Sequence, residues 1–468
     1  MANSWLTEEW LILKPYVVSL TLATLFILLL TTGCASQQDG PGQAGIIPQT
    51  MSPSAGVDSM TLVATDGNAS LYKIGNISVI RVEGSYREMG RQYGRLVGTD
   101  IAKMYETIVA SIGEPGFIIG LESEEQLVNF SMRQYSLYPQ EYREIVEGMA
   151  ESSGIPVAHI AVIDQVVPTF ALYPQTELTP DRVQAILAGK VDPTPGNTSA
   201  IPDGHHCSSI IAWGDYTGGG PLVMGRNFDF GQAYRHFNPY RSVIVYNPTD
   251  GSVPTAVLGW PGTVGGIEMF NRAGLVMETD DNHVVTAPNN EVHIDRIPLT
   301  VLVLRLGMDS ATIEQFDAAM KTARFGYPLL SNVATEEEGY TYEIGTRDVV
   351  RRGDDRYGLQ VIANFPLAPY WDEPSDMTDL DTGLSISRRN NLIALAEKYK
   401  GAINATVMEA ILDTRYADGG ASFDTAPEGG SVTIYQFVYI PKTRMLYLKA
   451  PTYDDWTAVP LAPLFKNP

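Results

Sequence analysis

The stretch HHCSSIIAW at 205–213, continued by GRNFDF at 225–230, decides how this sequence is expected to fold. A cysteine begins one apolar run, a Gly-Gly-Gly turn follows, and a second apolar run ends in Arg-Asn-Phe-Asp. Two apolar runs joined by a glycine-rich turn are typical of a β-hairpin, and their weak polar–apolar alternation predicts strands covered on both faces. We therefore expect the hairpin to place the thiol of Cys207 near Arg226 and Asp229, and we expect the chain to expose Cys207 as a new N-terminus.

The composition excludes some classes of function. The sequence has 468 residues, 44% of them hydrophobic, so it can bury a large core in one domain or two. It carries 54 acidic and 32 basic residues, which argues against a nucleic-acid partner because phosphate binding needs clustered Lys and Arg. The two cysteines, Cys34 and Cys207, each have a separate predicted role, so we expect no disulfide.

The first 34 residues are predicted to be an export segment. Residues 17–30 are almost wholly apolar, and TTGCA at 31–35 follows them. A short apolar region before a small-residue site is typical of a secretory signal. Its ending resembles a bacterial lipobox, which implies that Cys34 is lipidated and becomes the mature N-terminus. An uncleaved helical anchor over 10–31 is the alternative, since that run is long enough to span a bilayer. Both interpretations place the body on a membrane outside the cytoplasm, at the periplasmic or extracellular face of the envelope.

Residues 35–70, rich in Gln, Gly, Pro and Ser, are expected to form a flexible tether, and residues 71–206 a mainly helical pro-region. In that region 77–82 is a strand candidate, and a capping box at Ser85 and Glu88 begins a helix with an apolar stripe. Glycines at 90, 94 and 98 predict close packing of this helix on another element, and 139–154 and 157–167 predict further helices. Residues 174–206 carry five prolines and little apolar periodicity, which predicts an exposed linker ending at His206, where a cut would free Cys207.

Residues 207–468 are expected to form the catalytic part. The pattern there turns mostly to strands, and runs of antiparallel strands with segregated helices predict an α+β fold. The strand candidates are 208–213, 222–227, 242–246, 255–258, 266–270, 275–279, 340–344, 360–363, 432–439 and 445–449, and the helix candidates are 299–306, 312–324, 387–400 and 406–415.

Several short motifs recur in a defined order from about residue 71 to residue 450. They are EGSYREMG at 83–90, YP at 138–139 with EGMA at 147–150, CSS at 207–209 with GRNFD at 225–229, GTVG at 262–265 with FNRAGL at 270–275, ANFP at 363–366 and SISR at 385–388. In this order they resemble the N-terminal-nucleophile amidohydrolases related to choloylglycine hydrolase, penicillin V acylase and acid ceramidase. Within that superfamily the sequence is most similar to the isopenicillin-N acyltransferase-like autoprocessing enzymes.

The resemblance implies a four-layer αββα fold and self-cleavage between His206 and Cys207, after which the two chains stay associated. It also implies that Asn364 and Asn282 supply donors to an oxyanion. Arg388 resembles the last arginine of the site, although the adjacent Arg389 is easily mistaken for it. No cofactor is implied.

Elementary chemistry supports the same roles. A thiol is nucleophilic only as the thiolate, and a free cysteine has a pKa near about 8.5. An α-amino group has a pKa of roughly 7.7, so an N-terminal Cys207 carries its own base. We expect Arg226 to supply positive charge near the sulfur, and Asp229 to hold the ammonium or the thiol in place.

A zinc site is a competing hypothesis, because His205 and His206 adjoin Cys207 and His236, His283 and His293 lie downstream. Adjacent ligands do not readily point at one metal, and neither H-E-x-x-H nor C-x-x-C spacing is present, so we expect no metal. A serine hydrolase is disfavoured because the sequence has no G-x-S-x-G elbow.

The sequence therefore predicts an exported, membrane-tethered enzyme that hydrolyses linear, non-peptide amide bonds through an acyl-enzyme. N-acyl amides, penicillins and conjugated bile salts are the substrate classes considered. An acyltransferase that uses the same acyl-enzyme is one alternative. A non-catalytic binding lipoprotein on the same fold is another, and the intact Cys, Arg, Asp and Asn set argues against it.

Overall fold

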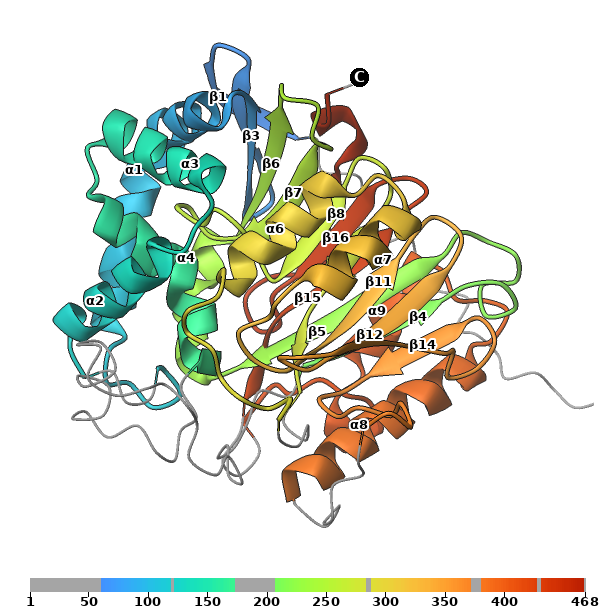
Figure 1. The fold of residues 1–468 in the computed structure, drawn as a ribbon. Coiled ribbons are helices and arrows are strands. Elements are labelled where there is room, and N and C mark those ends of the chain that lie inside the picture. The colour runs from blue at the N-terminus through green and yellow to red at the C-terminus, as the bar shows by residue number, and fades with distance from the viewer. Residues whose placement is uncertain are drawn as a thin grey trace, which may run out of the picture. The chain divides into compact units, whose positions relative to one another are not determined.

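Two β-sheets packed face to face form the centre of the structure, with helices on both outer faces (Figure 1). The computed structural model describes residues 60–118, 122–172, 207–282, 288–371, 380–426 and 431–466, all within the unit Pro53–Pro468. The predicted export segment with Cys34, most of the tether, and the linker up to His206 lie outside the described residues. Within the described ranges, no helix is both long enough and apolar enough to cross a membrane.

The larger sheet joins the parts of the chain before and after Cys207. Its strand order is β1-β2-β3-β6-β7-β8-β9-β11-β12-β13, with β10 paired to β11. The strands are β1 (Thr61–Asp66), β2 (Ala69–Ile74), β3 (Ile77–Gly84), β6 (Ser242–Pro248), β7 (Thr255–Gly259), β8 (Glu268–Asn271), β9 (Val276–Glu278), β10 (Asp280–Asp281), β11 (Leu329–Ala334), β12 (Gly339–Ile344) and β13 (Val349–Arg352). β3 lies parallel to β6, so the segment predicted to be a pro-region contributes strands to the same sheet as the catalytic part.

The smaller sheet contains the predicted hairpin. Its strand order is β14-β4-β5-β15-β16-β17, and β4 lies antiparallel to β5 with Ser208 opposite Asn227. The strands are β4 (Ser208–Ala212), β5 (Val223–Phe230), β14 (Leu359–Ile362), β15 (Val432–Ile440), β16 (Met445–Lys449) and β17 (Thr457–Pro460). The hairpin prediction is therefore confirmed.

Helices cover the outer face of each sheet, as Figure 1 shows. α1 and α6 contact the larger sheet and α7 packs beside α6, while α8 and α9 contact the smaller sheet. The α-helices are α1 (Tyr86–Ala110), α2 (Glu124–Tyr135), α3 (Gln140–Ser153), α4 (Val157–Leu172), α6 (Leu299–Asp309), α7 (Ile313–Thr322), α8 (Leu380–Lys398) and α9 (Ala405–Asp413), and the 3-10 helices are η1 (Gln232–Tyr240), η2 (Tyr416–Asp418) and η3 (Ala462–Leu464). Because β11 and β12 lie against β14 and β4, the order of layers is αββα, and the predicted fold class is confirmed.

The two faces of β5 look into different parts of the core. Met224 and Phe228 pack in the cluster between the sheets, whereas Val223 packs in the cluster under α8 and α9. Gly225 also faces the helices, because a Cβ placed there would lie 2.8 Å from the side chain of Met408 on α9. Since side chains alternate along a strand, Arg226 points between the sheets and Asp229 points toward the helices.

The predicted close packing at glycines 90, 94 and 98 is confirmed. A Cβ on Gly90 would lie 2.2 Å from the carbonyl oxygen of Ile145, and a Cβ on Gly94 would lie 2.5 Å from that of Met149. α1 and α3 therefore approach each other backbone to backbone, which only glycine permits.

Two sequence predictions need correction. Residues 61–70 were expected to be part of the tether, but they form β1 and the start of β2. The prediction also omitted α2, β10, β11, β13 and β17. In β11 the polar pair Ser331 and Asn332 interrupts an apolar run, and both side chains are buried. The hydroxyl of Ser331 donates to the backbone oxygen of Glu278, and the amide of Asn332 bonds the hydroxyls of Ser209 and Thr341. A strand that buries paired polar groups has no clear apolar pattern.

Candidate active site

Cys207 precedes β4 at one end of the smaller sheet. The residue is buried, with 3% of its surface exposed, and its Sγ lies 3.5 Å from the backbone oxygen of Asp229, to which the thiol can donate. The pairing of β4 with β5 creates this contact, since it brings the first residue of the hairpin beside the end of its second strand.

Arg388, on α8, connects the residues around Cys207. Its Nη1 donates to the backbone oxygen of Cys207 at 3.0 Å and lies 3.9 Å from Oδ2 of Asp229. Its Nη2 donates to Oδ1 of Asn364 at 2.9 Å and to the hydroxyl of Ser385 at 3.0 Å. One fully buried guanidinium therefore holds the predicted nucleophile, the predicted anion and one predicted oxyanion donor in a fixed arrangement.

The adjacent arginine has different partners. Arg389 forms an ion pair with Asp355 and donates to the backbone oxygen of Val361 at 3.3 Å. Successive residues on a helix point about 100° apart, so only one of the two arginines faces Cys207. The structure thus separates two residues that the sequence leaves hard to distinguish.

Asp229 is buried on the helix-facing side of β5. The hydroxyl of Thr433 donates to its Oδ1 at 2.6 Å, and no hydrogen bond from the described residues reaches its Oδ2. Burial raises the pKa of this carboxyl to about 7, while Arg388, Thr433 and Arg226 lower it. The carboxylate is therefore near its titration point at neutral pH, and Oδ2 remains available to accept a hydrogen bond from a cation.

The sequence placed Arg226 and Asp229 together near the thiol, but the two side chains do not form an ion pair with each other. Arg226 instead forms ion pairs with Glu268, with Glu278 (Nε to Oε2, 3.2 Å) and with Asp280 (Nη2 to Oδ1, 3.1 Å), all on the larger sheet. The physical reason is the alternation along β5, because residues three apart on a strand point to opposite faces.

Among the described residues, Arg226 is the one cation within ion-pair distance of these three carboxylates, and all four side chains are buried. Burial raises the pKa of Glu268 despite the opposing effect of Arg226. Burial and the neighbouring charge of Glu278 raise the pKa of Asp280, again against Arg226. Both effects favour a cluster that retains protons, because several unbalanced buried charges are very costly.

These surroundings favour the neutral thiol of Cys207. Burial raises the pKa of Cys207, and the charges of Asp280, Asp229 and Asp281 raise it further, while Arg226 lowers it. A base close to the sulfur is therefore needed to form the thiolate.

The two predicted oxyanion asparagines differ in their contacts. Asn364 follows β14 with φ = 48°, donates from Nδ2 to the backbone oxygen of Asp281 at 2.9 Å, and accepts from Arg388. Asn282 follows β10 and is 4% exposed, and neither atom of its amide has a hydrogen-bond partner among the described residues. A buried amide without partners is costly, so Asn282 has donor capacity for a bound group.

The sequence analysis missed Thr433, Ser385 and the acidic cluster of Glu268, Glu278 and Asp280. The acidic residues did carry a signal. Glu268 and Glu278 each lie within a short apolar stretch, and a carboxylate inside such a stretch indicates a buried partner.

The histidines of the zinc hypothesis fall into two groups. His205, His206 and His283 lie outside the described residues. His236 contacts Glu114, and His293 lies near Glu291 and Asp295. In the part of the chain that the structure describes, no group of three or more His, Cys, Asp or Glu side chains is arranged to hold a metal ion.

Comparison with known proteins gives matches only among solved structures. No family model matches the sequence, and no curated protein matches it. Similar solved structures include a mutant of conjugated bile acid hydrolase from Clostridium perfringens (12% identity, 56% of this chain and 95% of that chain, TM-score 0.41). They also include penicillin V acylase from Agrobacterium tumefaciens (12%, 56% and 88%, 0.38) and the Caenorhabditis elegans ortholog of N-acylethanolamine-hydrolyzing acid amidase (16%, 50% and 93%, 0.35).

Proposed function

We propose that the chain is an amidohydrolase whose nucleophile is Cys207, freed as an N-terminal residue by cleavage after His206. The observation that carries the proposal is the convergence of Cys207, Asp229 and Asn364 on the single guanidinium of Arg388. A thiol, a carboxylate and an amide donor held by one buried cation are the parts that acyl transfer needs.

The freed α-amine would be the base of the reaction. It lies on the same residue as the thiol, and its pKa of roughly 7.7 lets it take the thiol proton at neutral pH. The resulting ammonium needs a nearby anion, and Oδ2 of Asp229 accepts no other hydrogen bond from the described residues. Asp229, oriented by Thr433, would thus favour the charged form of the amine.

The proposed reaction forms a thioester and then hydrolyses it, and it uses no cofactor. The sulfur attacks the carbonyl carbon of the substrate amide, and the negative charge that develops on oxygen is stabilised by Nδ2 of Asn282 and of Asn364. The C–N bond then breaks, the ammonium of Cys207 returns its proton to the leaving amine, and a thioester remains. Water, deprotonated by the α-amine, attacks the thioester and releases the acid. An amine in place of water would give acyl transfer.

The substrate classes proposed are N-acyl amides, penicillins and conjugated bile salts, each of which contains a linear amide bond. The experiment is an activity screen over these three classes, with the mature N-terminus determined by intact-mass analysis and N-terminal sequencing. We expect a chain that begins at Cys207, and we expect Cys207→Ala to remain uncut and inactive. The proposal fails if the wild-type enzyme, fully alkylated at Cys207, keeps its amidase activity.

We also propose that the enzyme is exported and anchored through a lipid on Cys34. The support is the apolar run at 17–30, which ends just before a small residue and this cysteine. Cys34→Ser is expected to abolish metabolic labelling by fatty acid, whereas Cys207→Ala should leave labelling unchanged. Persistent labelling of Cys34→Ser would rule out lipidation at this position.

A further inference from the structure

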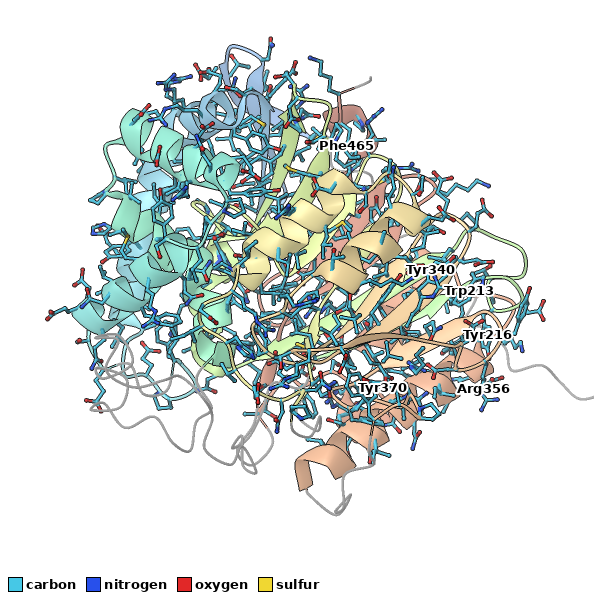
Figure 2. All side chains as sticks on the ribbon, in the orientation of Figure 1. Trp213, Tyr216, Tyr340, Arg356, Tyr370 and Phe465 are labelled. Carbon is cyan, nitrogen blue, oxygen red and sulfur yellow. The ribbon has the colours of Figure 1, made fainter. Side chains whose placement is uncertain are left out.

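The loop that follows Asn364 is held by one buried carboxylate. Oε1 of Glu343, on β12, accepts from the backbone nitrogen of Leu367 at 2.7 Å, and Oε2 accepts from that of Ala368 at 2.9 Å. Oε2 also accepts from the indole nitrogen of Trp371 at 2.7 Å. Three donors from one short loop, which Tyr370 marks in Figure 2, therefore converge on a single side chain.

The charge of Glu343 is balanced inside the core. The residue is 1% exposed, and its Oε1 lies 3.0 Å from Nε of Arg352. Arg352 also pairs with Asp355, which in turn pairs with Arg389 on α8. The carboxylate therefore accepts three hydrogen bonds from the loop and lies in an ion pair with one arginine. This chain of charges also ties the loop to the helix that carries Arg388.

Asn364 occupies a backbone conformation that needs such support. Its φ of 48° lies in the left-handed region, which residues other than glycine adopt rarely. Conformations of this kind persist only where the surroundings fix them. Arg388 and the backbone of Asp281 hold its side chain, and the loop held by Glu343 continues directly from its backbone. Pro366 lies between Asn364 and the first anchored residue, so the connection has little freedom.

We propose that Glu343 is a positioning residue for Asn364, and that it sets where the amide of Asn364 meets the oxyanion. The proposal rests on the proposed function, because it requires Asn364 to contact the reacting carbonyl. Glu343 acts only through the loop at 364–371. Its loss should therefore affect the transition state more than the binding of substrate.

Glu343→Gln is the substitution that tests this proposal most directly. A Gln amide has the same size but offers one acceptor oxygen and one donor group, so at least one loop N–H faces another donor. The loop must then shift, and a displacement of about 1 Å at a reacting group can cost on the order of 100-fold in rate. We expect kcat to fall by roughly 10- to 100-fold, with KM within about 3-fold of wild type.

A double-mutant cycle tests the mechanism. If Glu343 acts through Asn364, then Glu343→Gln should lower kcat by less than about 3-fold in an Asn364→Ala background, because the donor it positions is already absent. Asp454→Asn is the matched control. Asp454 also accepts a backbone N–H, that of Ala450 at 2.8 Å, and pairs with an arginine, but it lies on the turn after β16. Its effect on kcat should be within about 2-fold and the same in both backgrounds.

Trp371→Phe covers the case in which Glu343→Gln does not fold, since it removes one of the three loop bonds and keeps an aromatic ring. We expect a several-fold loss in kcat that disappears in the Asn364→Ala background. The proposal is overturned if folded Glu343→Gln or Trp371→Phe retains wild-type kcat, or loses the same factor with and without Asn364. Failure of the proposed function is recognised separately, since wild type alkylated at Cys207 would then stay active whatever residue stands at 343.

Discussion

Two fully buried arginines lie on opposite faces of the smaller sheet, and their surroundings differ. Arg388, on the helix side, lies within ion-pair distance of one carboxylate of the described residues, that of Asp229, and donates to a backbone oxygen, an amide and a hydroxyl. Arg226, on the side of the larger sheet, has three carboxylates within ion-pair distance. We call the first the balanced side, since one described carboxylate faces Arg388 there. We call the second the acidic side, since three face Arg226.

This difference in surrounding charge indicates that Arg388 and Arg226 have different roles. The balanced side keeps Oδ2 of Asp229 without a hydrogen bond from the described residues, which suits a site that must receive an ammonium. The acidic side joins the two sheets, because Glu278 also accepts from Ser209 on β4 and Glu268 accepts from Tyr435 on β15. We infer that Arg388 acts in turnover. Arg226 offsets part of the negative charge where the two sheets meet, and we infer that the stability of the fold depends on it.

The largest expected effect is that of Arg226→Gln. Arg226 is the one cation within ion-pair distance of these three buried carboxylates among the described residues, and breaking a single buried ion pair already costs about 3–5 kcal/mol. We expect the variant to be insoluble or to unfold at a much lower temperature, as measured by calorimetry. Adding Glu268→Gln should restore part of the stability. Arg351→Gln, which removes a half-exposed arginine paired with Asp317, is the control and should shift the melting temperature little. A folded Arg226→Gln with wild-type stability would contradict the assigned role.

The second prediction compares Arg388→Lys with Arg389→Lys. Lysine keeps the charge but cannot make the fork of hydrogen bonds by which Arg388 holds Cys207 and Asn364. We expect kcat of Arg388→Lys to fall by roughly 100-fold, and that of Arg389→Lys by less than about 10-fold. Steady-state kinetics on the substrate found in the screen would measure both. Equal losses in the two variants would remove the distinction between these neighbours.

The last prediction concerns the pH dependence of folding stability and tests the side of the sheet that carries Asp229. In the folded chain burial raises the pKa of Asp229 to about 7, whereas an unfolded aspartate titrates near about 3.9. Between these values the folded state binds more protons than the unfolded state, so this group makes stability fall as the pH rises from about 4 to about 7.

We expect Asp229→Asn, introduced into the uncut Cys207→Ala chain, to flatten that decline by up to about 1.4 kcal/mol per pH unit. The variant should therefore be more stable than its parent at pH 7 and similar to it at pH 4. Urea unfolding across this range is the measurement. Parallel curves for parent and variant would show that Asp229 does not carry a raised pKa.

Much of the local structure could be predicted from the sequence. The hairpin at 207–230 and the glycine contacts of α1 with α3 follow from patterns that extend over a few residues. Strand β11 could not be predicted in this way, because its buried Ser331 and Asn332 resemble surface residues until Glu278, Ser209 and Thr341 are placed beside them. Its polar groups are paired by residues distant in sequence, and propensity does not register such pairing.

The sequence by itself determined that Cys207 begins a buried hairpin strand and that Arg226 and Asp229 lie at the end of the next strand. The resemblance to N-terminal-nucleophile amidohydrolases further implied Asn282, Asn364 and Arg388. Only the tertiary structure decided which groups meet. It turned Arg226 toward three acids on the other sheet, placed Asp229 beside Arg388, and paired Arg389 with Asp355. The physical reason is that side-chain alternation is a local property of a strand, whereas the partner facing each side chain depends on how sheets and helices pack, and that packing is set by contacts between residues far apart in the chain.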